Sequence, residues 1–300
     1  MKLASFTNKD GFTQWGIVNE EKQTILGAAD LEEIYFTFLP ETLNELIEKG
    51  DEGRLLLATA LEKYKEMPEN IAYPLSEVTI NLPIEPRRNV ICIGKNYNDH
   101  VNELGSKLND STQAPTQPIF FTKATNTVIP AQAFIPSHSG VTSEIDYEGE
   151  LGIIIGKQAS HIPINEAPDY VFGYTIINDV TARDLQKRHQ QWFLGKSLDG
   201  FCPMGPYILL KEDKELRDFE IHTYVNDELR QAGDTSDMIF SVASMISTLS
   251  QGMTLEAGDI IATGTPAGVG MGFNPPKYLH SGDTVKITIE DIGTLTNTIK

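Results

Sequence analysis

The sequence has few cysteines, few basic residues and no long apolar run. Only two of the 300 residues are cysteine, Cys92 and Cys202, and neither belongs to a Cys-x-x-Cys spacing. A disulfide framework and a zinc ribbon are therefore excluded. No segment approaches the about 20 apolar residues that cross a bilayer, and the N-terminus lacks the apolar stretch of a signal peptide. These absences predict a cytoplasmic protein without a membrane partner.

The scarcity of basic residues also restricts the partners. The chain carries 24 Lys and Arg against 42 Asp and Glu, a formal net charge of −18. Such a surface repels phosphate backbones and anionic lipids, which excludes nucleic acid as a partner. If the substrate is itself an anion, the site must supply local positive charge. A metal ion and a few Lys or Arg side chains would do so.

The chain is predicted to be α+β and mainly β, in two domains. Residues 1–85 read as a small α+β domain, and a segment with two prolines, 81–89, is typical of a linker. In residues 86–300, short apolar strands separated by turns dominate, with helices at 181–191 and 241–250. Regular helices do not separate the strands, so a doubly wound parallel sheet is not indicated. The expected strands of this second domain are 90–94, 119–123, 151–155, 173–178, 207–210, 221–225, 259–263 and 284–289.

One short stretch carries carboxylates at every second position, namely Glu144, Asp146, Glu148 and Glu150. On an extended strand, all four would project from the same face. Like charges this close repel one another, and burial strengthens the repulsion. The run leads into the apolar segment 151–156, so a hard divalent cation bound through oxygen is one explanation. A solvated, acidic edge strand is the other.

A further carboxylate, Asp179, ends the apolar strand that precedes the helix at 181–191. Thr181 is a plausible N-cap for that helix, which would place Arg183 and Gln186 about one turn apart. At a strand end, Asp179 could join two carboxylates of a neighbouring strand. It could equally be a cap or turn residue.

A histidine and a glutamate, His100 and Glu103, stand three residues apart. On a short helix they would share a face, so Glu103 could orient the imidazole and raise its basicity. Such a pair can activate water at neutral pH, although a surface hydrogen bond is the alternative. The polar stretch 104–117 that follows is typical of a mobile cover over a site.

The glycine-rich loop 263–272 matches neither the phosphate-binding Gly-x-x-x-x-Gly-Lys-Ser/Thr pattern nor a dinucleotide fingerprint. Gly-x-Ser-x-Gly and His-Glu-x-x-His are also absent, which removes the usual signals of serine hydrolases and zinc proteases. Five segments in this order do resemble one known family, the fumarylacetoacetate hydrolase (FAH) superfamily. They are 94–100 (Gly-Lys-Asn-Tyr-x-x-His), 146–157, 173–184, 195–197 and 258–266.

The resemblance covers roughly residues 88–300 and implies a β-roll catalytic domain, usually a homodimer, that holds Mg2+ or Mn2+ through three carboxylates. The region before it is similar to the small extra domain of longer bacterial members. Asp146 matches a motif position with a structural role only. By motif position, the implied metal ligands are Glu148, Glu150 and Asp179, the catalytic residues are His100, Glu103 and Lys196, and the substrate contacts are Arg183, Gln186 and Thr265.

The implied function is divalent-metal-dependent cleavage of a C–C bond in a β-keto or β-diketo acid through a pyruvate enolate. The enzyme would be an acylpyruvate hydrolase, an oxaloacetate decarboxylase or both, and its partner a small anionic keto acid. One alternative is a 5-carboxymethyl-2-hydroxymuconate-type isomerase or decarboxylase of aromatic catabolism. An alternative of another class is a non-catalytic binding or scaffold protein that retains the fold.

Overall fold

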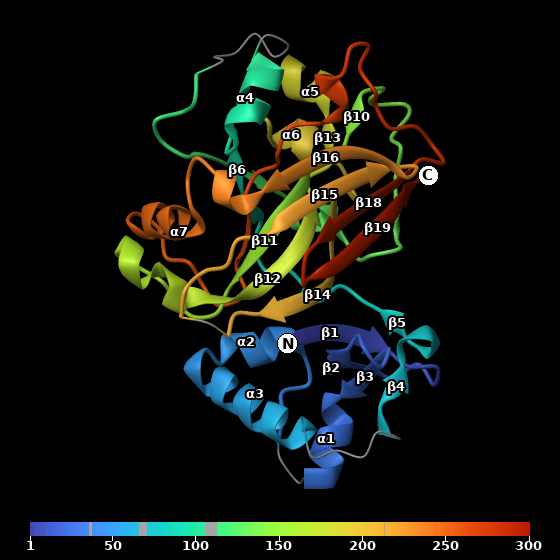
Figure 1. Cartoon of the computed structure of the whole chain (residues 1–300), viewed down its shortest axis with the longest axis vertical. Coiled ribbons are helices and arrows are strands. Elements are labelled where there is room, and N and C mark those ends of the chain that lie inside the picture. The colour runs from blue at the N-terminus through green and yellow to red at the C-terminus, as the bar shows by residue number, and fades with distance from the viewer. Residues whose placement is uncertain (36–37, 66–70, 106–112, 213) are drawn as a thin grey trace.

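The computed structural model describes residues 1–35, 38–65, 71–105, 113–212 and 214–300 (Figure 1). The N-terminal part has short strands with helices beside them, which agrees with the predicted α+β composition. Helix α2 (Leu43–Glu48) begins where the hydroxyl of Thr42 accepts a hydrogen bond from the amide of Glu45, and it buries its apolar face. The elements of this part are β1 (Lys2–Thr7), β2 (Thr13–Asn19), β3 (Thr24–Gly27), α1 (Ala28–Tyr35), α2 (Leu43–Glu48), α3 (Asp51–Tyr64), β4 (Tyr73–Pro74) and β5 (Thr79–Ile80).

One large sheet combines the N-terminal strands with strands from the rest of the described chain. Its strand order is β4-β3-β2-β1-β14-β12-β11-β17-β6-β7. Every residue of the two central strands, β11 and β12, is buried, as expected for apolar strands covered on both faces. The fold is mainly β, so the predicted fold class is confirmed. The strands that follow the N-terminal part are β6 (Val90–Gly94), β7 (Ile119–Lys123), β11 (Gly149–Ile155), β12 (Val171–Asn178), β14 (Cys202–Leu210) and β17 (Ile260–Ala262).

A second sheet covers one face of the large sheet and has the strand order β16-β15-β18-β19-β9. The two sheets lie close together at Gly149, where an added Cβ would lie only 2.3 Å from the hydroxyl of Thr223. A side chain there would push the sheets apart at the start of β11. The members of this sheet are β9 (Phe134–Ile135), β15 (Glu220–Val225), β16 (Glu228–Asp234), β18 (Thr284–Ile289) and β19 (Gly293–Ile299).

Short helices and strands complete the fold. Figure 1 shows α4, α5 and α6 at the end of the molecule away from β1–β5. None of the helices in the described ranges is both long and apolar enough to cross a membrane. These elements are α4 (Asn98–Gly105), β8 (Val128–Ile129), β10 (Ile145–Asp146), β13 (Thr181–Ala182), α5 (Arg183–Arg188), α6 (Phe193–Lys196) and α7 (Val242–Ser250).

Two local expectations were wrong. The four alternating carboxylates do not share one strand, because residues 145–146 form β10, which pairs with β13, and β11 begins only at Gly149. Thr181 lies in β13 and is not a helix N-cap; its hydroxyl donates to the carbonyl of Asp179 at 2.9 Å. Part of the predicted cover at 104–117 lies outside the described residues.

The N-terminal part is joined to the large sheet by backbone pairing. Lys2 pairs with Leu209 and Leu3 with Ile208, which adds β1 to the edge of β14. One apolar cluster contains residues of both parts, including Leu3, Ile208 and Phe172. The two parts therefore share a core. The domain boundary near residue 85 stays a prediction.

Deletion of residues 1–85 is expected to yield a protein that aggregates. The deletion would uncover the edge of β14 and the apolar residues packed beneath β1, and exposed sheet edges pair with other chains. Size-exclusion chromatography and a thermal melt of the truncated protein check this. A monodisperse product that melts at the temperature of the full chain would contradict the shared core.

Candidate metal centre

Three buried carboxylates meet where β11 and β12 lie side by side. The antiparallel register pairs Gly149 with Asn178, which brings the residues flanking Gly149 next to Asp179. Glu148, Glu150 and Asp179 each offer one oxygen, and these oxygens lie within 4.8 Å of one another. The arrangement is that of a divalent-cation site with oxygen ligands. The structure thus brings together the three predicted ligands, and their role as ligands stays a prediction.

Two buried lysines neutralise part of this charge. Nζ of Lys196 donates to Glu148 Oε2 and to Asp179 Oδ2, both at 2.7 Å. Nζ of Lys123 donates to Asp179 Oδ1 at 2.5 Å and to the carbonyl of Val180 at 3.0 Å. Both oxygens of Asp179 are therefore engaged by ammonium groups.

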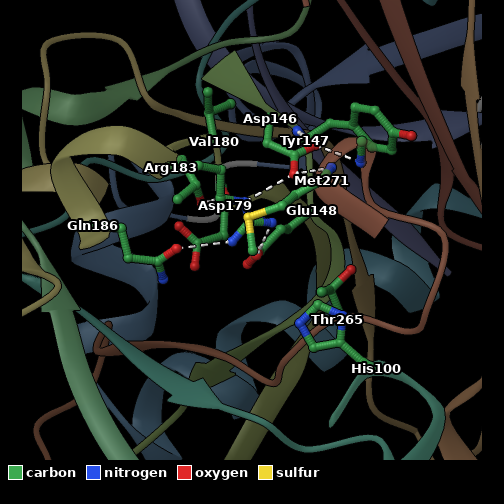
Figure 2. A network of polar contacts seen from close by, with 12 residues as sticks. His100, Asp146, Tyr147, Glu148, Asp179, Val180, Arg183, Gln186, Thr265 and Met271 are labelled. Atoms are coloured by element: carbon green, nitrogen blue, oxygen red, sulfur yellow. Dashed lines mark hydrogen bonds and ion pairs between the residues drawn. The ribbon is translucent and has the colours of Figure 1, made fainter. Parts of the chain in front are cut away.

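A buried arginine forms the third cation of the site. Nη2 of Arg183 lies 2.7 Å from Glu148 Oε1, and its Nε donates to Asp146 Oδ2 at 2.8 Å. Its Nη1 donates to the side-chain oxygen of Gln186 at 3.1 Å. Figure 2 shows Arg183 among these partners. The predicted substrate contacts Arg183 and Gln186 are thus one hydrogen-bonded unit.

These contacts set the charge of each group. Burial alone would raise the pKa of Glu148, but the positive charges of Lys196 and Arg183 outweigh it and lower that pKa below its usual range. Burial alone would likewise lower the pKa of Lys196, yet Asp179 and Glu148 raise it to about 12. In the metal-free protein, Lys196 is therefore an ammonium ion at neutral pH.

Glu150 differs from the other two carboxylates. Its Oε2 accepts a hydrogen bond from the amide of Gly264 at 2.8 Å, and within the described ranges no Lys or Arg forms an ion pair with it. Burial, followed by the negative charges of Asp179 and Glu148, raises the pKa of Glu150 well above its ordinary value. Without a further cation, the site favours the protonated form of this carboxyl group.

The residues present fit a divalent metal ion. Four buried carboxylates, those of Asp146, Glu148, Glu150 and Asp179, face only three buried Lys and Arg side chains in the described part of the chain. A dication bound through oxygen would supply the missing positive charge at Glu150. Mg2+ and Mn2+ prefer such oxygen donors.

The predicted His100 and Glu103 pair lies on α4, beside the carboxylates. His100 is buried, but its Nδ1 is 3.6 Å from Glu103 Oε2, which is longer than a hydrogen bond. Both oxygens of Glu103 instead accept from the amide of Gly268, at 3.0 and 3.1 Å. Glu103 therefore holds α4 against the glycine-rich loop, and the water-activating role of the pair stays a prediction.

One cavity unites most of these side chains. Thr265, the third predicted substrate contact, lines this cavity. Its hydroxyl donates to the carbonyl of Gly149 at 2.9 Å, which anchors the glycine-rich loop to β11. Apolar side chains also line the cavity, among them Leu104, Phe121 and Trp192. The predicted site residues that line the cavity are His100, Glu148, Glu150, Arg183, Gln186, Lys196 and Thr265. Glu103 and Asp179 do not line it, but they lie next to the lining residues His100 and Lys196, respectively.

Sequence reasoning missed two polar residues of the site. Lys123 ends the apolar strand β7, and a charged residue at that place was the only signal available. Gln231 lies on β16, whose polar sequence gives no signal. Its amide nitrogen donates to Thr265 Oγ1 at 2.7 Å, and its oxygen accepts from the amide of Gly149 at 3.0 Å.

Comparison with known proteins identifies the family. The family description "Fumarylacetoacetate (FAA) hydrolase C-terminal" matches residues 89–300. The chain belongs to the fumarylacetoacetate hydrolase family. The predictions of an FAH-superfamily member and of an enzyme are therefore confirmed.

Several relatives resemble this FAH-family chain over nearly its whole length. Oxaloacetate tautomerase YisK of Bacillus subtilis (strain 168) is 50% identical over 289 residues, which is 94% of each chain. The solved fumarylacetoacetate hydrolase of Exiguobacterium antarcticum is 40% identical, with a TM-score of 0.82 over 100% of this chain and 99% of the other. A 5-carboxymethyl-2-hydroxymuconate delta-isomerase of Mycobacterium smegmatis is 30% identical, with a TM-score of 0.73 over 100% and 98% of the two chains.

We expect Glu150→Gln to stabilise the metal-free protein and to abolish its stabilisation by Mn2+. Glutamine can keep the hydrogen bond from Gly264 but carries no charge. Because the folded-state pKa of Glu150 is raised, its contribution to folding is favourable below about pH 4.5 and is lost progressively as the pH rises. The gain from the substitution should therefore grow with pH, by up to about 1.4 kcal/mol per unit.

Thermal melts from pH 5 to pH 8, with and without Mn2+, measure both effects. Glu144→Gln is a matched control, because Glu144 is only half-buried and pairs with Lys187 at 3.1 Å. A variant that melts below the wild type at every pH, or that Mn2+ still stabilises, would contradict the assignment of Glu150.

Proposed function

We propose that this FAH-family enzyme acts on oxaloacetate or a closely related β-keto acid through an enolate, with Mg2+ or Mn2+ held by Glu148, Glu150 and Asp179. One observation carries the proposal: the ammonium of Lys196 and the guanidinium of Arg183 border the same cavity as Glu148 and Glu150 of the acidic triad. A site of this kind binds a small dianion and stabilises negative charge that forms on its oxygen. The 50% identity to a curated oxaloacetate tautomerase supports this substrate class.

The side chains of the cavity have distinct tasks in this chemistry. Arg183 and Gln186, already bonded to each other, can bind a substrate carboxylate. Lys196 stays protonated and places a fixed positive charge beside the developing enolate. A metal ion bound by the triad would supply Lewis-acid stabilisation of the same charge. Thr265 holds the loop that closes this side of the cavity.

Two related reactions each form an enolate in this site, decarboxylation the enolate of pyruvate and tautomerisation the enolate of oxaloacetate itself. In decarboxylation, the bond between C3 and C4 of oxaloacetate breaks, CO2 leaves, and the electron pair remains as pyruvate enolate until C3 is protonated. In tautomerisation, a proton leaves C3 and another is taken up by the carbonyl oxygen. His100 borders the cavity with an Nδ1 that no described residue hydrogen-bonds, so it can move a proton there.

Hydrolysis of an acylpyruvate is a related activity, in which His100 would act on water as well as on the substrate. With that substrate, His100 would deprotonate a water that attacks the distal carbonyl. An isomerase of hydroxymuconate acids has weaker support, since the solved enzyme with that name is 30% identical.

Several finer features belong to the same proposal. The family resemblance supports a homodimer and a cytoplasmic enzyme, and the net charge of −18 supports the exclusion of nucleic acid and anionic membranes as partners. The start of the family match at residue 89 supports a domain boundary near residue 85.

Lys196→Met should lower kcat for oxaloacetate by about 100-fold to 1,000-fold, as removal of one charge-stabilising donor does elsewhere. The assay is pyruvate formation and enol absorbance with Mg2+, with Mn2+ and with EDTA. Lys187→Met is the matched control, because Lys187 lies on the nearby α5, is about a third exposed and pairs only with Glu144 among the described ion pairs. Wild-type protein that leaves oxaloacetate unchanged under all three conditions would overturn the proposed function.

His100→Ala is expected to reduce acetylpyruvate hydrolysis by at least tenfold more than oxaloacetate decarboxylation, because only hydrolysis needs an attacking water. Parallel steady-state assays of the two substrates measure the difference. Equal losses for both would argue against water activation by His100.

A further inference from the structure

Helix α4, which carries His100, is held in place by the glycine-rich loop. Both oxygens of Glu103 accept from the amide of Gly268, at 3.0 and 3.1 Å. Leu104 packs against Val269 and Met271 in a small apolar cluster of its own. At Gly272, an added Cβ would lie 1.9 Å from Glu103 Oε1, so only glycine leaves room for this contact. The position of the loop therefore determines the position of α4.

The far side of this loop is held by Asp146. Its Oδ1 accepts from the amide of Gly270 at 2.6 Å, and its Oδ2 accepts from the amide of Met271 at 3.0 Å. The neighbouring Tyr147 donates its hydroxyl to the carbonyl of Gly268 at 2.8 Å. The loop is thus fixed between Glu103 on one side and residues 146–147 on the other.

The same carboxylate also holds a residue of the metal centre. Oδ2 of Asp146 accepts from Arg183 Nε at 2.8 Å, and Arg183 in turn pairs with Glu148 at 2.7 Å and with Gln186 at 3.1 Å. Figure 2 shows Asp146 between Met271 and Arg183. Asp146 is fully buried. A continuous series of polar contacts therefore leads from Glu103 through the loop and Asp146 to Glu148.

We propose that Asp146 is a positioning residue that couples the docking of α4 to the state of the metal ligand Glu148. This rests on the proposed metal centre. While Asp146 shares the guanidinium, Arg183 competes less strongly with a metal for Glu148. The carboxylate of Asp146 also holds the loop in the position in which the amide of Gly268 can donate to Glu103. Metal binding and closure of the helix that bears His100 thereby favour each other, and such coupling is reciprocal.

Asp146→Asn tests the coupling, because both oxygens of the carboxylate only accept hydrogen bonds, whereas an asparagine side chain has one acceptor and one donor group. Its two oxygens receive four donors, which are the amides of Tyr147, Gly270 and Met271 and the Nε of Arg183. Asparagine would turn an NH2 group toward two of these donors and could accept hydrogen bonds only from the other two. The variant keeps the size of the side chain and loses either the bonds from Tyr147 and Gly270 or those from Met271 and Arg183, so it weakens the link between the loop and Arg183.

The experiment is a double-mutant cycle on the Mn2+ dissociation constant, measured by calorimetry for the wild type, Glu103→Ala, Asp146→Asn and the double variant. Glu103→Ala leaves Asp146 and the ligands intact, and we expect it to weaken Mn2+ binding about fivefold, at the lower end of known allosteric couplings. Asp146→Asn should weaken it about tenfold or more, as loss of groups behind metal ligands does. In the Asp146→Asn background, Glu103→Ala should add less than twofold. Glu144→Gln, in the same segment, should leave the constant unchanged, because the side chain of Glu144 contacts Lys187 and Tyr278 and none of the residues substituted in the cycle.

Amide hydrogen exchange of residues 98–105 in the metal-free proteins provides a second readout. Asp146→Asn should accelerate exchange there to the level of Glu103→Ala, and Mn2+ should slow it in the wild type only. Additive effects on the dissociation constant, or wild-type exchange in metal-free Asp146→Asn, would overturn the coupling. If Asp146→Asn does not fold, Gly272→Ala replaces it, and an unchanged Mn2+ constant in that variant would equally refute the link. Neither readout requires turnover, so an inactive protein that shows the coupling would refute the proposed function alone.

Discussion

The structure depends on a buried charge imbalance at the start of β11. Carboxylates that are taken out of water destabilise the fold unless cations pair with them. Here the described residues supply Lys123, Lys196 and Arg183, which leaves Glu150 without a cationic partner. Burial, followed by the negative charges of Asp179 and Glu148, therefore raises the pKa of that group. A metal ion would remove the charge imbalance. The imbalance that destabilises the metal-free protein would therefore favour metal binding.

The fold supports this imbalance through close packing. β11 and β12 are buried along their whole length, and Gly149 lets the second sheet approach within van der Waals distance. Gln231 reaches from that sheet to Gly149 and to Thr265, so both sheets and the glycine-rich loop are tied at one point. The ligands therefore have little freedom to separate, although their charges repel.

Much of this site was predictable from the sequence. The apolar runs predicted the strands β11 and β12. The family motifs predicted that Glu148, Glu150 and Asp179, at or next to the ends of these strands, are metal ligands. Simple alternation, in contrast, placed Glu144 and Asp146 on the same strand, because the break at residues 147–148 depends on the pairing of β10 with β13. The contacts of Lys123 and Gln231 with the site were not predictable, since their partners lie tens of residues away in the chain.

The most direct test of the account is a crystal structure of the protein grown with Mn2+ and measured for anomalous scattering. The account predicts a single anomalous peak in contact with Glu148, Glu150 and Asp179, with Lys196 no longer bonded to both Glu148 and Asp179. An empty triad in which Lys196 still bridges these two carboxylates, at saturating Mn2+, would contradict it.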